Sequence, residues 1–137
     1  MNKRGHPLIA LTFLTQGCTN GMANVEAATA SALTPTQLIA TIEAHKGQAV
    51  TVVGYFTYAT DTRALWENEA AHRDAEHLRE GSWDKCITIY PSDPHARRFN
   101  GRHVHITGKA ALIDRNDIRS LWTCNPVAVE NAIITRG

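Results

Sequence analysis

The stretch that decides the fold is Gly47-Gln48-Ala49-Val50-Thr51-Val52-Val53-Gly54, and its pattern returns as Gly101-Arg102-His103-Val104-His105-Ile106-Thr107-Gly108. Both copies read Gly-x-x-Val-x-Val/Ile-x-Gly, in which a turn glycine leads into a half-buried strand that reaches a second glycine. A glycine inside a strand marks a bulge or a bend, because it has no side chain to pack and tolerates unusual backbone angles. Two bent strands in a short chain predict a small coiled β-barrel, which is a fold suited to binding.

The rest of the chain supplies the other elements of such a barrel. Thr34 suits the N-cap of a helix, Pro35 suits its first position, and Gly47 is expected to end it. A second helix is predicted between the second and third strands. The predicted strands are 48–58, 63–66, 85–90, 102–112 and 127–134, with the second helix at 67–79 and one helical turn at 95–99.

Residues 47–134 resemble a group of small exported bacterial domains with an OB-like fold. The resemblance implies a mainly β domain with helical insertions: a five-stranded OB-like Greek-key barrel, with an N-terminal helix and another helix between strands 2 and 3. It implies no settled catalytic role, and fold alone assigns none. The motifs that carry it are the two repeat copies, Ala64-Leu65-Trp66, Cys86-Ile87-x-Ile89-Tyr90 and Phe99-Asn100-Gly101.

The two repeat copies are not interpreted as a duplication. The first copy leads to Trp66 and a charged helix, whereas the second leads to a polar loop and Cys124. The copies are better explained as two barrel strands that meet the same bending requirement.

The N-terminus has the pattern of an export signal at 1–17. Lys3 and Arg4 form a positive region, and residues 8–14 form a short apolar run, followed by small residues. The alternative is a cytosolic protein with an apolar N-terminal strand. No apolar run approaches the roughly 18–20 residues that span a bilayer.

Thr15-Gln16-Gly17-Cys18 resembles the lipobox of bacterial lipoproteins, in which the cysteine is lipidated and becomes the new N-terminus. The sequence departs from that pattern at Thr15, where an aliphatic residue is usual. Cleavage after Ala23 or Ala30 is the alternative. Residues 18–33 are small and polar and predict a flexible tether before a domain at 34–137. The expected location is the periplasm, with attachment to the outer membrane if Cys18 is lipidated.

The remaining cysteines, Cys86 and Cys124, form an even pair. In an oxidising compartment two such cysteines usually bond, so we predict a disulfide between them. Two buried thiols are the alternative. There is no Cys-x-x-Cys, which argues against a zinc ribbon or a thioredoxin-like redox site.

The sequence contains no recognisable catalytic motif. The sequence lacks Gly-x-Ser-x-Gly, a phosphate loop, His-Glu-x-x-His and a nucleotide-binding glycine motif. We therefore expect no enzyme activity, no catalytic residues, no metal and no cofactor.

Two pairs of residues are candidate metal or acid–base sites, and we interpret both as solvent-exposed. His103 and His105 share one face of a strand but have no marked third ligand, and His72 and Glu76 share a helix face. A metal-dependent hydrolase is the least favoured alternative. Asp114-x-Asn116-Asp117 resembles a fragment of a calcium loop and is interpreted as a turn.

The charges are segregated along the sequence. Residues 61–93 carry eight acids and four bases, whereas residues 95–119 carry six bases and two acids, although the whole chain has a net charge of only +1. In a five-stranded barrel these segments are expected to lie partly on different surfaces, which predicts a dipolar domain whose electric field steers partners and sets specificity. A solvated surface with internally paired charges is the alternative. The residues expected to contact a ligand are Arg97, Arg98, Arg102, His103, His105, Lys109, Tyr55 and Tyr58.

These features together predict an exported binding module with a protein partner in the cell envelope. An immunity or inhibitor lipoprotein, which neutralises an incoming toxin or hydrolase, is one form of this hypothesis. The alternative is an OB domain that binds nucleic acid or an oligosaccharide. A membrane is expected to be contacted only through the lipid anchor.

Overall fold

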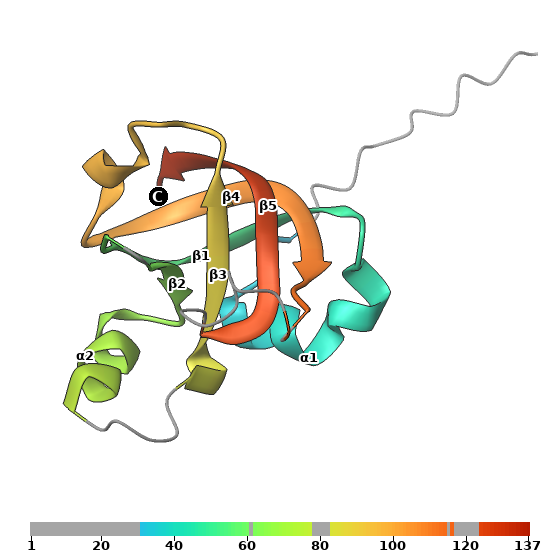
Figure 1. Cartoon of the computed structure of the whole chain (residues 1–137), viewed down its shortest axis with the longest axis horizontal. Helices are drawn as coiled ribbons and strands as arrows, with labels where there is room; N and C mark the ends of the chain where they lie inside the picture. Colours follow the sequence, from blue (N-terminus) through green and yellow to red (C-terminus); the bar gives the residue numbers. More distant parts are fainter. Residues whose placement is uncertain (1–30, 61, 78–82, 115, 117–123) are drawn as a thin grey trace, which may run out of the picture.

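The computed structural model describes residues 31–60, 62–77, 83–114, 116 and 124–137 (Figure 1). The export signal, Cys18, the proposed cleavage sites, Asp117 and Trp122 lie outside these residues. The predictions made for them therefore stay predictions.

Five strands, two α-helices and two short 3₁₀ turns make up the described part of the chain. The predicted bounds of β2 and β4 are confirmed to the residue, and β5 extends two residues further at each end than predicted. The elements are α1 (Pro35–His45), β1 (Ala49–Tyr58), β2 (Arg63–Trp66), α2 (Glu69–His77), η1 (Trp83–Lys85), β3 (Cys86–Pro91), η2 (Ala96–Phe99), β4 (Arg102–Leu112) and β5 (Asn125–Arg136).

The strands close into a barrel in the order β1-β2-β3-β5-β4, with β4 returning to β1. Neighbouring strands are antiparallel except β3 and β5, which run parallel. Figure 1 shows β5 beside β3, with α1 beneath the barrel and α2 projecting to one side. The predicted OB-like barrel, with one helix before β1 and one between β2 and β3, is confirmed.

The second glycine of each repeat copy lies where the chain is crowded. The register between β4 and β5 shifts at Gly108, and a β-carbon there would lie 2.6 Å from the backbone oxygen of Glu130. No register shift accompanies Gly54, but a β-carbon at that position would overlap the backbone oxygen of Trp66. Gly108 therefore marks the predicted bulge, whereas Gly54 permits a close approach between β1 and β2.

The inward side chains of all five strands form one core, which is closed at both ends. Leu38 and Ile42 of α1 cover one end, and Ala96 and Phe99 of η2 cover the other. The strand residues in this core are Val50, Val52, Phe56, Leu65, Ile87, Ile89, Val104, Ile106, Ala110, Val127, Val129, Ala132 and Ile134.

The start of α1 is fixed by a reciprocal pair of hydrogen bonds. The Gln37 backbone N–H donates to Thr34 Oγ1 at 3.3 Å, and the Thr34 N–H donates to Gln37 Oε1 at 2.9 Å. Pro35 follows the cap and has no N–H to satisfy, as predicted. This cap holds α1 in position across the end of the barrel.

Cys86 and Cys124 form the predicted disulfide, and their Cα atoms are 5.4 Å apart. Cys86 begins β3 and Cys124 directly precedes β5, so the bond joins the N-terminal ends of two neighbouring parallel strands. The alternative of two buried thiols is wrong.

Candidate functional site

Strand direction gathers arginines at the barrel end that η2 closes. β2 and β4 begin at this end, whereas β1, β3 and β5 end there, so distant parts of the sequence become neighbours. Tyr58, the last residue of β1, pairs with Arg63, and its backbone N–H donates to Asn100 Oδ1 at 2.8 Å. We call this region the arginine-rich end and define it by Arg63, Arg97, Arg98, Arg102 and Arg136.

The arginine-rich end carries one acidic side chain among the described residues. This acid is Asp93, within the described residues of 58–63, of 90–103 and of the end of β5. Asp93 Oδ2 lies 2.8 Å from Nη2 of Arg98, so this pair neutralises itself. Asp61 lies outside the described residues. The other guanidinium groups leave this end positively charged.

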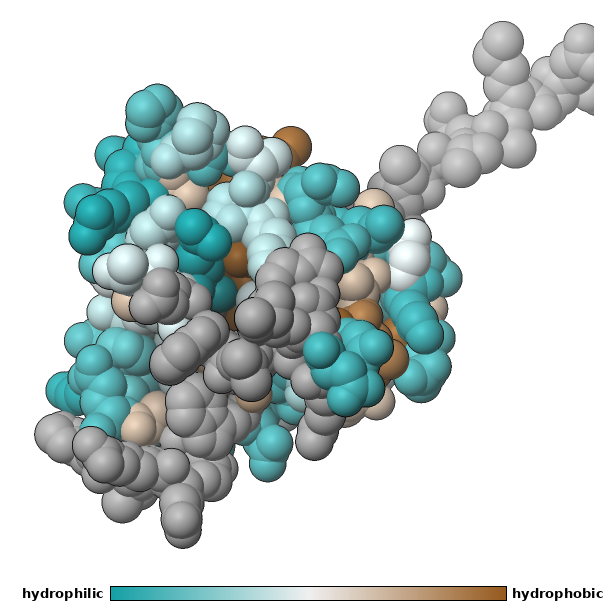
Figure 2. Space-filling view, in the orientation of Figure 1, coloured by the Kyte–Doolittle hydropathy of each residue, from teal (hydrophilic) through white to brown (hydrophobic). Residues whose placement is uncertain are grey.

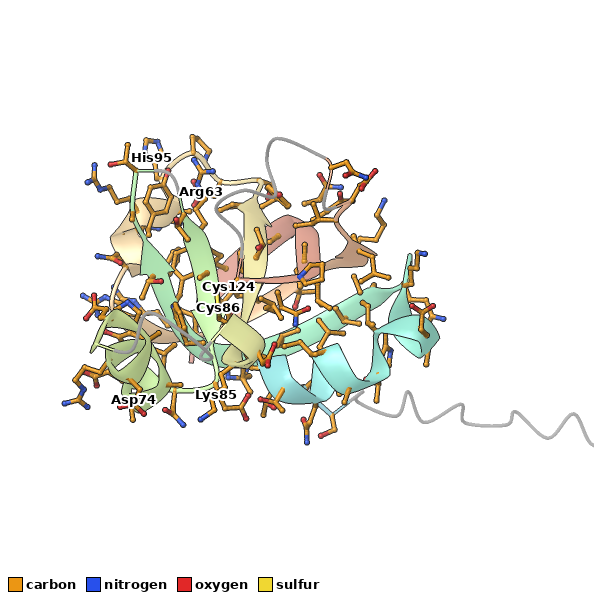
Figure 3. The ribbon with its side chains drawn as sticks, turned by 60° about the horizontal axis from the view of Figure 1, so that its bottom comes forward. Arg63, Asp74, Lys85, Cys86, His95 and Cys124 are labelled. Atoms are coloured by element: carbon orange, nitrogen blue, oxygen red, sulfur yellow. A yellow bond between two sulfur atoms is a disulfide. The ribbon has the colours of Figure 1, made fainter. Side chains whose placement is uncertain are left out.

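Figures 2 and 3 show the arginine-rich end in two orientations. In Figure 2 the strongest hydrophilic colour lies over η2 and the start of β4. In Figure 3 Arg63 and His95 lie at one end of the barrel, whereas Asp74 and Lys85 lie at the other. The dipolar distribution of charge stays a prediction.

A small pocket opens at the arginine-rich end, with a volume of about 190 Å³. The guanidinium of Arg63 lies over the ring of Tyr58, with Cζ 4.9 Å from its centroid, and Nη2 donates to Tyr58 Oη at 3.2 Å. Stacking and hydrogen bonding together fix the position of this cation. The pocket is lined by Tyr58, Arg63, Tyr90, Pro91, Asp93 and Pro94.

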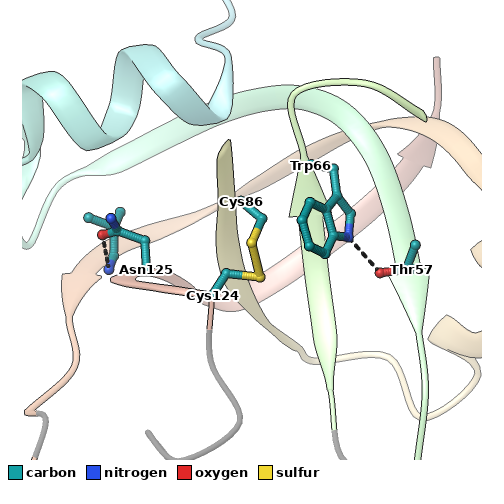
Figure 4. The surroundings of a disulfide bond; sticks show 6 residues. Thr57, Trp66, Cys86, Cys124 and Asn125 are labelled. Carbon is teal, nitrogen blue, oxygen red and sulfur yellow. Dashed lines mark hydrogen bonds between the residues drawn. A yellow bond between two sulfur atoms is a disulfide. The ribbon is translucent and has the colours of Figure 1, made fainter. Parts of the chain in front are cut away.

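The outer face of β2 and β3, where OB-folds commonly bind oligonucleotides and oligosaccharides, is closed in this chain. Ala64, Trp66, Cys86 and Thr88 on that face are exposed by only 1%, 6%, 0% and 6%. The Trp66 indole N–H donates to Thr57 Oγ1 at 2.9 Å, and the disulfide lies beside it (Figure 4). Among the described residues, these two strands present no open aromatic platform for base stacking.

Tyr55 takes part in packing on the barrel wall. Its ring centroid lies 5.8 Å from that of His72 on α2 and 5.6 Å from that of His103 on β4. Trp66, the cross-strand partner of Tyr55, also contacts His72, with ring centroids 5.1 Å apart. These contacts attach α2 to the barrel and leave Tyr55 half-buried.

The predicted ligand residues fall into separate places. Arg97, Arg98, Arg102 and Tyr58 meet at the arginine-rich end, whereas Lys109 lies near the other end of β4. Lys109 Nζ is 3.4 Å from Oε2 of its neighbour Glu130. His103 and His105 are exposed on the outer wall and alternate with buried Val104 and Ile106, as the pattern predicted. The predicted set is therefore not one continuous surface.

His72 and Glu76, one of the candidate metal or acid–base pairs, lie close together on α2. His72 Nε2 lies 3.6 Å from Glu76 Oε1, and no group of three His, Cys, Asp or Glu side chains in the described chain could hold a metal. Asp114 Oδ1 accepts the Asn116 backbone N–H at 2.9 Å, which supports the turn interpretation of that motif.

Arg63, Tyr90 and Asp93 were not among the predicted ligand residues. Each belongs to a strand end or a turn, and only the strand pairing brings them beside Tyr58. The stretch Pro91-Ser92-Asp93-Pro94 has the composition of a turn, but its place beside β2 depends on the strand pairing.

Comparison of the chain with protein-family models, with curated proteins and with solved structures gives no match. Within the described residues, neither α-helix has the length and apolar character that a membrane span requires.

Proposed function

We propose that this chain is an exported OB-like binding module of the bacterial cell envelope, without enzymatic activity, whose arginine-rich end docks an acidic protein partner. The periplasm is its site of action, and a lipid on Cys18 would hold it at the outer membrane. An immunity or inhibitor lipoprotein is the specific form that we favour.

The observation that carries the proposal is that, among the described residues, five arginines gather with one acidic side chain at one barrel end. Arginine is enriched in protein interfaces and among the residues that dominate binding energy. A positive end also steers an acidic partner during encounter and raises the association rate at low salt. An acidic patch on a partner is the matching surface.

The disulfide supports the exported location. Disulfides form and persist in oxidising compartments and are rare in the reducing cytosol. The bond between Cys86 and Cys124 is therefore consistent with an export signal at 1–17.

Single-stranded nucleic acid or an acidic oligosaccharide is the second candidate, because the same arginines would contact phosphate or carboxylate groups. The closed outer face of β2 and β3 weighs against it, since Trp66 is not available for stacking.

The test is affinity capture from envelope extracts with the tagged, exported protein. We expect a stoichiometric acidic protein that is lost in the double variant Arg97→Glu/Arg102→Glu, weakened by Arg102→Glu alone, and retained with the control Arg73→Glu, which makes the same single charge reversal on α2. Capture should weaken as salt rises from about 50 to about 300 mM, as the screening length shortens. Recovery of no stoichiometric protein contradicts the proposal, and tight binding of labelled single-stranded DNA would favour the second candidate.

A further inference from the structure

The pocket at the arginine-rich end combines a fixed cation with walls of tyrosine and proline. We propose that it binds one carboxylate group through Arg63, and that an acidic side chain of the protein partner supplies this group. The source of the carboxylate rests on the proposed function, whereas the chemistry of the pocket does not.

Arg63 is oriented and still has donors to offer. It stacks over Tyr58 and uses Nη2 for the hydrogen bond to Tyr58 Oη. A guanidinium has five N–H donors in a rigid planar arrangement, which matches the two oxygens of a carboxylate. Because the stacking already restricts the side chain, less conformational freedom is lost when a carboxylate binds.

The carboxylate of Asp93, which lines the pocket, already has two partners outside it. Asp93 Oδ2 is paired with Arg98 at 2.8 Å, and Asp93 Oδ1 accepts the His95 backbone N–H at 2.7 Å. No ion pair of the described residues involves Arg63. The pocket therefore presents a positive group whose charge Asp93 does not neutralise.

The size and charge of the pocket select a small, singly charged group. A volume of about 190 Å³ is smaller than the several hundred Å³ typical of sites for drug-sized ligands. One oriented guanidinium balances one carboxylate, whereas a phosphate ester carries up to about two negative charges at neutral pH. Pro91, Pro94 and the rings of Tyr58 and Tyr90 form the remaining walls beside the cation.

This arrangement fits an anchoring site within a larger interface. Tyrosine and arginine are the residue types that most often dominate interface energy, usually in pockets surrounded by weaker contacts. Arg97 and Arg102 would supply the surrounding positive field, and Arg63 would hold one inserted Asp or Glu side chain.

The test titrates the exported protein with acetate and follows backbone amide shifts by NMR, with chloride at equal ionic strength as the reference. We expect saturable shifts centred on Arg63, Tyr90 and Asp93, with a Kd on the order of millimolar, as suits so small a ligand. Arg63→Gln should abolish saturation, and Arg63→Lys should weaken it about tenfold because lysine lacks the planar pair of donors. The control Arg73→Gln should leave the titration unchanged, and thermal unfolding of each variant reports whether it is folded.

Saturation that persists unchanged in folded Arg63→Gln overturns the inference, as does saturation by inorganic phosphate without saturation by acetate. The partner experiment separates this inference from the proposed function. If Arg97→Glu/Arg102→Glu abolishes partner capture while Arg63→Gln changes neither capture nor the acetate titration, the pocket assignment fails and the proposed function stands. If acetate saturates the pocket but no partner is captured, the proposed function fails and the carboxylate site stands.

Discussion

Val52 of β1 lies directly opposite Ile106 of β4, so the two copies of the sequence repeat are partners in one antiparallel ladder. The pairing is symmetric about this point, because Val50 faces Gly108 and Gly54 faces Val104. The repeat therefore encodes two strands that bend around each other, and each copy supplies the glycine that faces the valine of the other.

The symmetry extends to the turn glycines that open the two copies. Gly47 and Gly101 have φ of 79° and 70°, a region that side chains with a β-carbon rarely adopt. The Gly47 N–H donates to the Ala110 carbonyl at 2.8 Å, and the Gly101 N–H donates to the Phe56 carbonyl at 2.9 Å. Each glycine thus ties the start of its own strand to the end of the other strand.

Gly108→Ala should destabilise the protein more than Gly47→Ala. A β-carbon at Gly108 meets the β5 backbone, and overpacking typically costs about 1–3 kcal/mol or more. A β-carbon at Gly47 meets no atom within 4 Å, so its cost is the backbone strain alone, about 1–2 kcal/mol. Urea unfolding of the two variants gives the comparison. Equal losses of unfolding free energy in the two variants would show that β4 and β5 can move apart at the bulge at little energetic cost.

Removing the disulfide should lower the free energy of unfolding substantially. The bond closes a loop of sequence separation 38, and the chain-entropy estimate for such a loop is about 4 kcal/mol. Chemical denaturation of Cys86→Ala/Cys124→Ala against the oxidised wild type measures this loss, with reduced wild type as the control. Mass measurement after alkylation should find neither cysteine free in the oxidised protein. Two thiols that alkylate under native conditions would contradict the exported location.

Thr34→Ala should lower the free energy of unfolding by about 1 kcal/mol, the usual cost of losing an N-cap side chain. The Thr34 hydroxyl accepts the Gln37 N–H at the first turn of α1, which covers one end of the core. Thermal unfolding measures the loss. Thr60→Ala is the matched control, because it removes the same atoms from an exposed loop. A loss no larger than that of the control would mean that α1 is held by packing alone.

The local elements could be predicted from the sequence because each depends on neighbouring residues. The Thr34 cap, the alternation of His103, Val104, His105 and Ile106, and the glycine turns are all set within a few positions. A barrel was expected from two glycine bends, whereas the structure has a bulge at Gly108 and a close strand approach at Gly54.

The pocket could not be predicted in the same way. Tyr58, Arg63, Tyr90 and Asp93 come from the ends of three strands and a turn, and none carries a local signal of binding. Their meeting depends on the pairing of β1 with β2 and of β2 with β3, which the barrel topology defines. The closure of the outer face of β2 and β3 likewise arises from burial of Trp66 and Cys86, and a sequence pattern alone does not distinguish a buried tryptophan from a stacking platform.

Arg102→Gln should weaken partner binding several-fold, whereas Lys109→Gln should leave it within about twofold. Both substitutions remove one positive charge from β4, but seven residues of strand separate them, which corresponds to about 23 Å at the usual rise per residue. The screening length at physiological salt is about 8 Å, so a charge near Lys109 contributes little to the field at the arginine-rich end. Lys109 is also compensated by Glu130 at 3.4 Å, and losing that exposed pair should change stability by less than about 1 kcal/mol.

Surface plasmon resonance with the captured partner measures both affinities, and the Arg102 effect should appear mainly in the association rate and shrink at high salt. An equal loss of affinity in the two variants would place the docking surface along the whole outer wall of β4, as the sequence-based set of ligand residues implied.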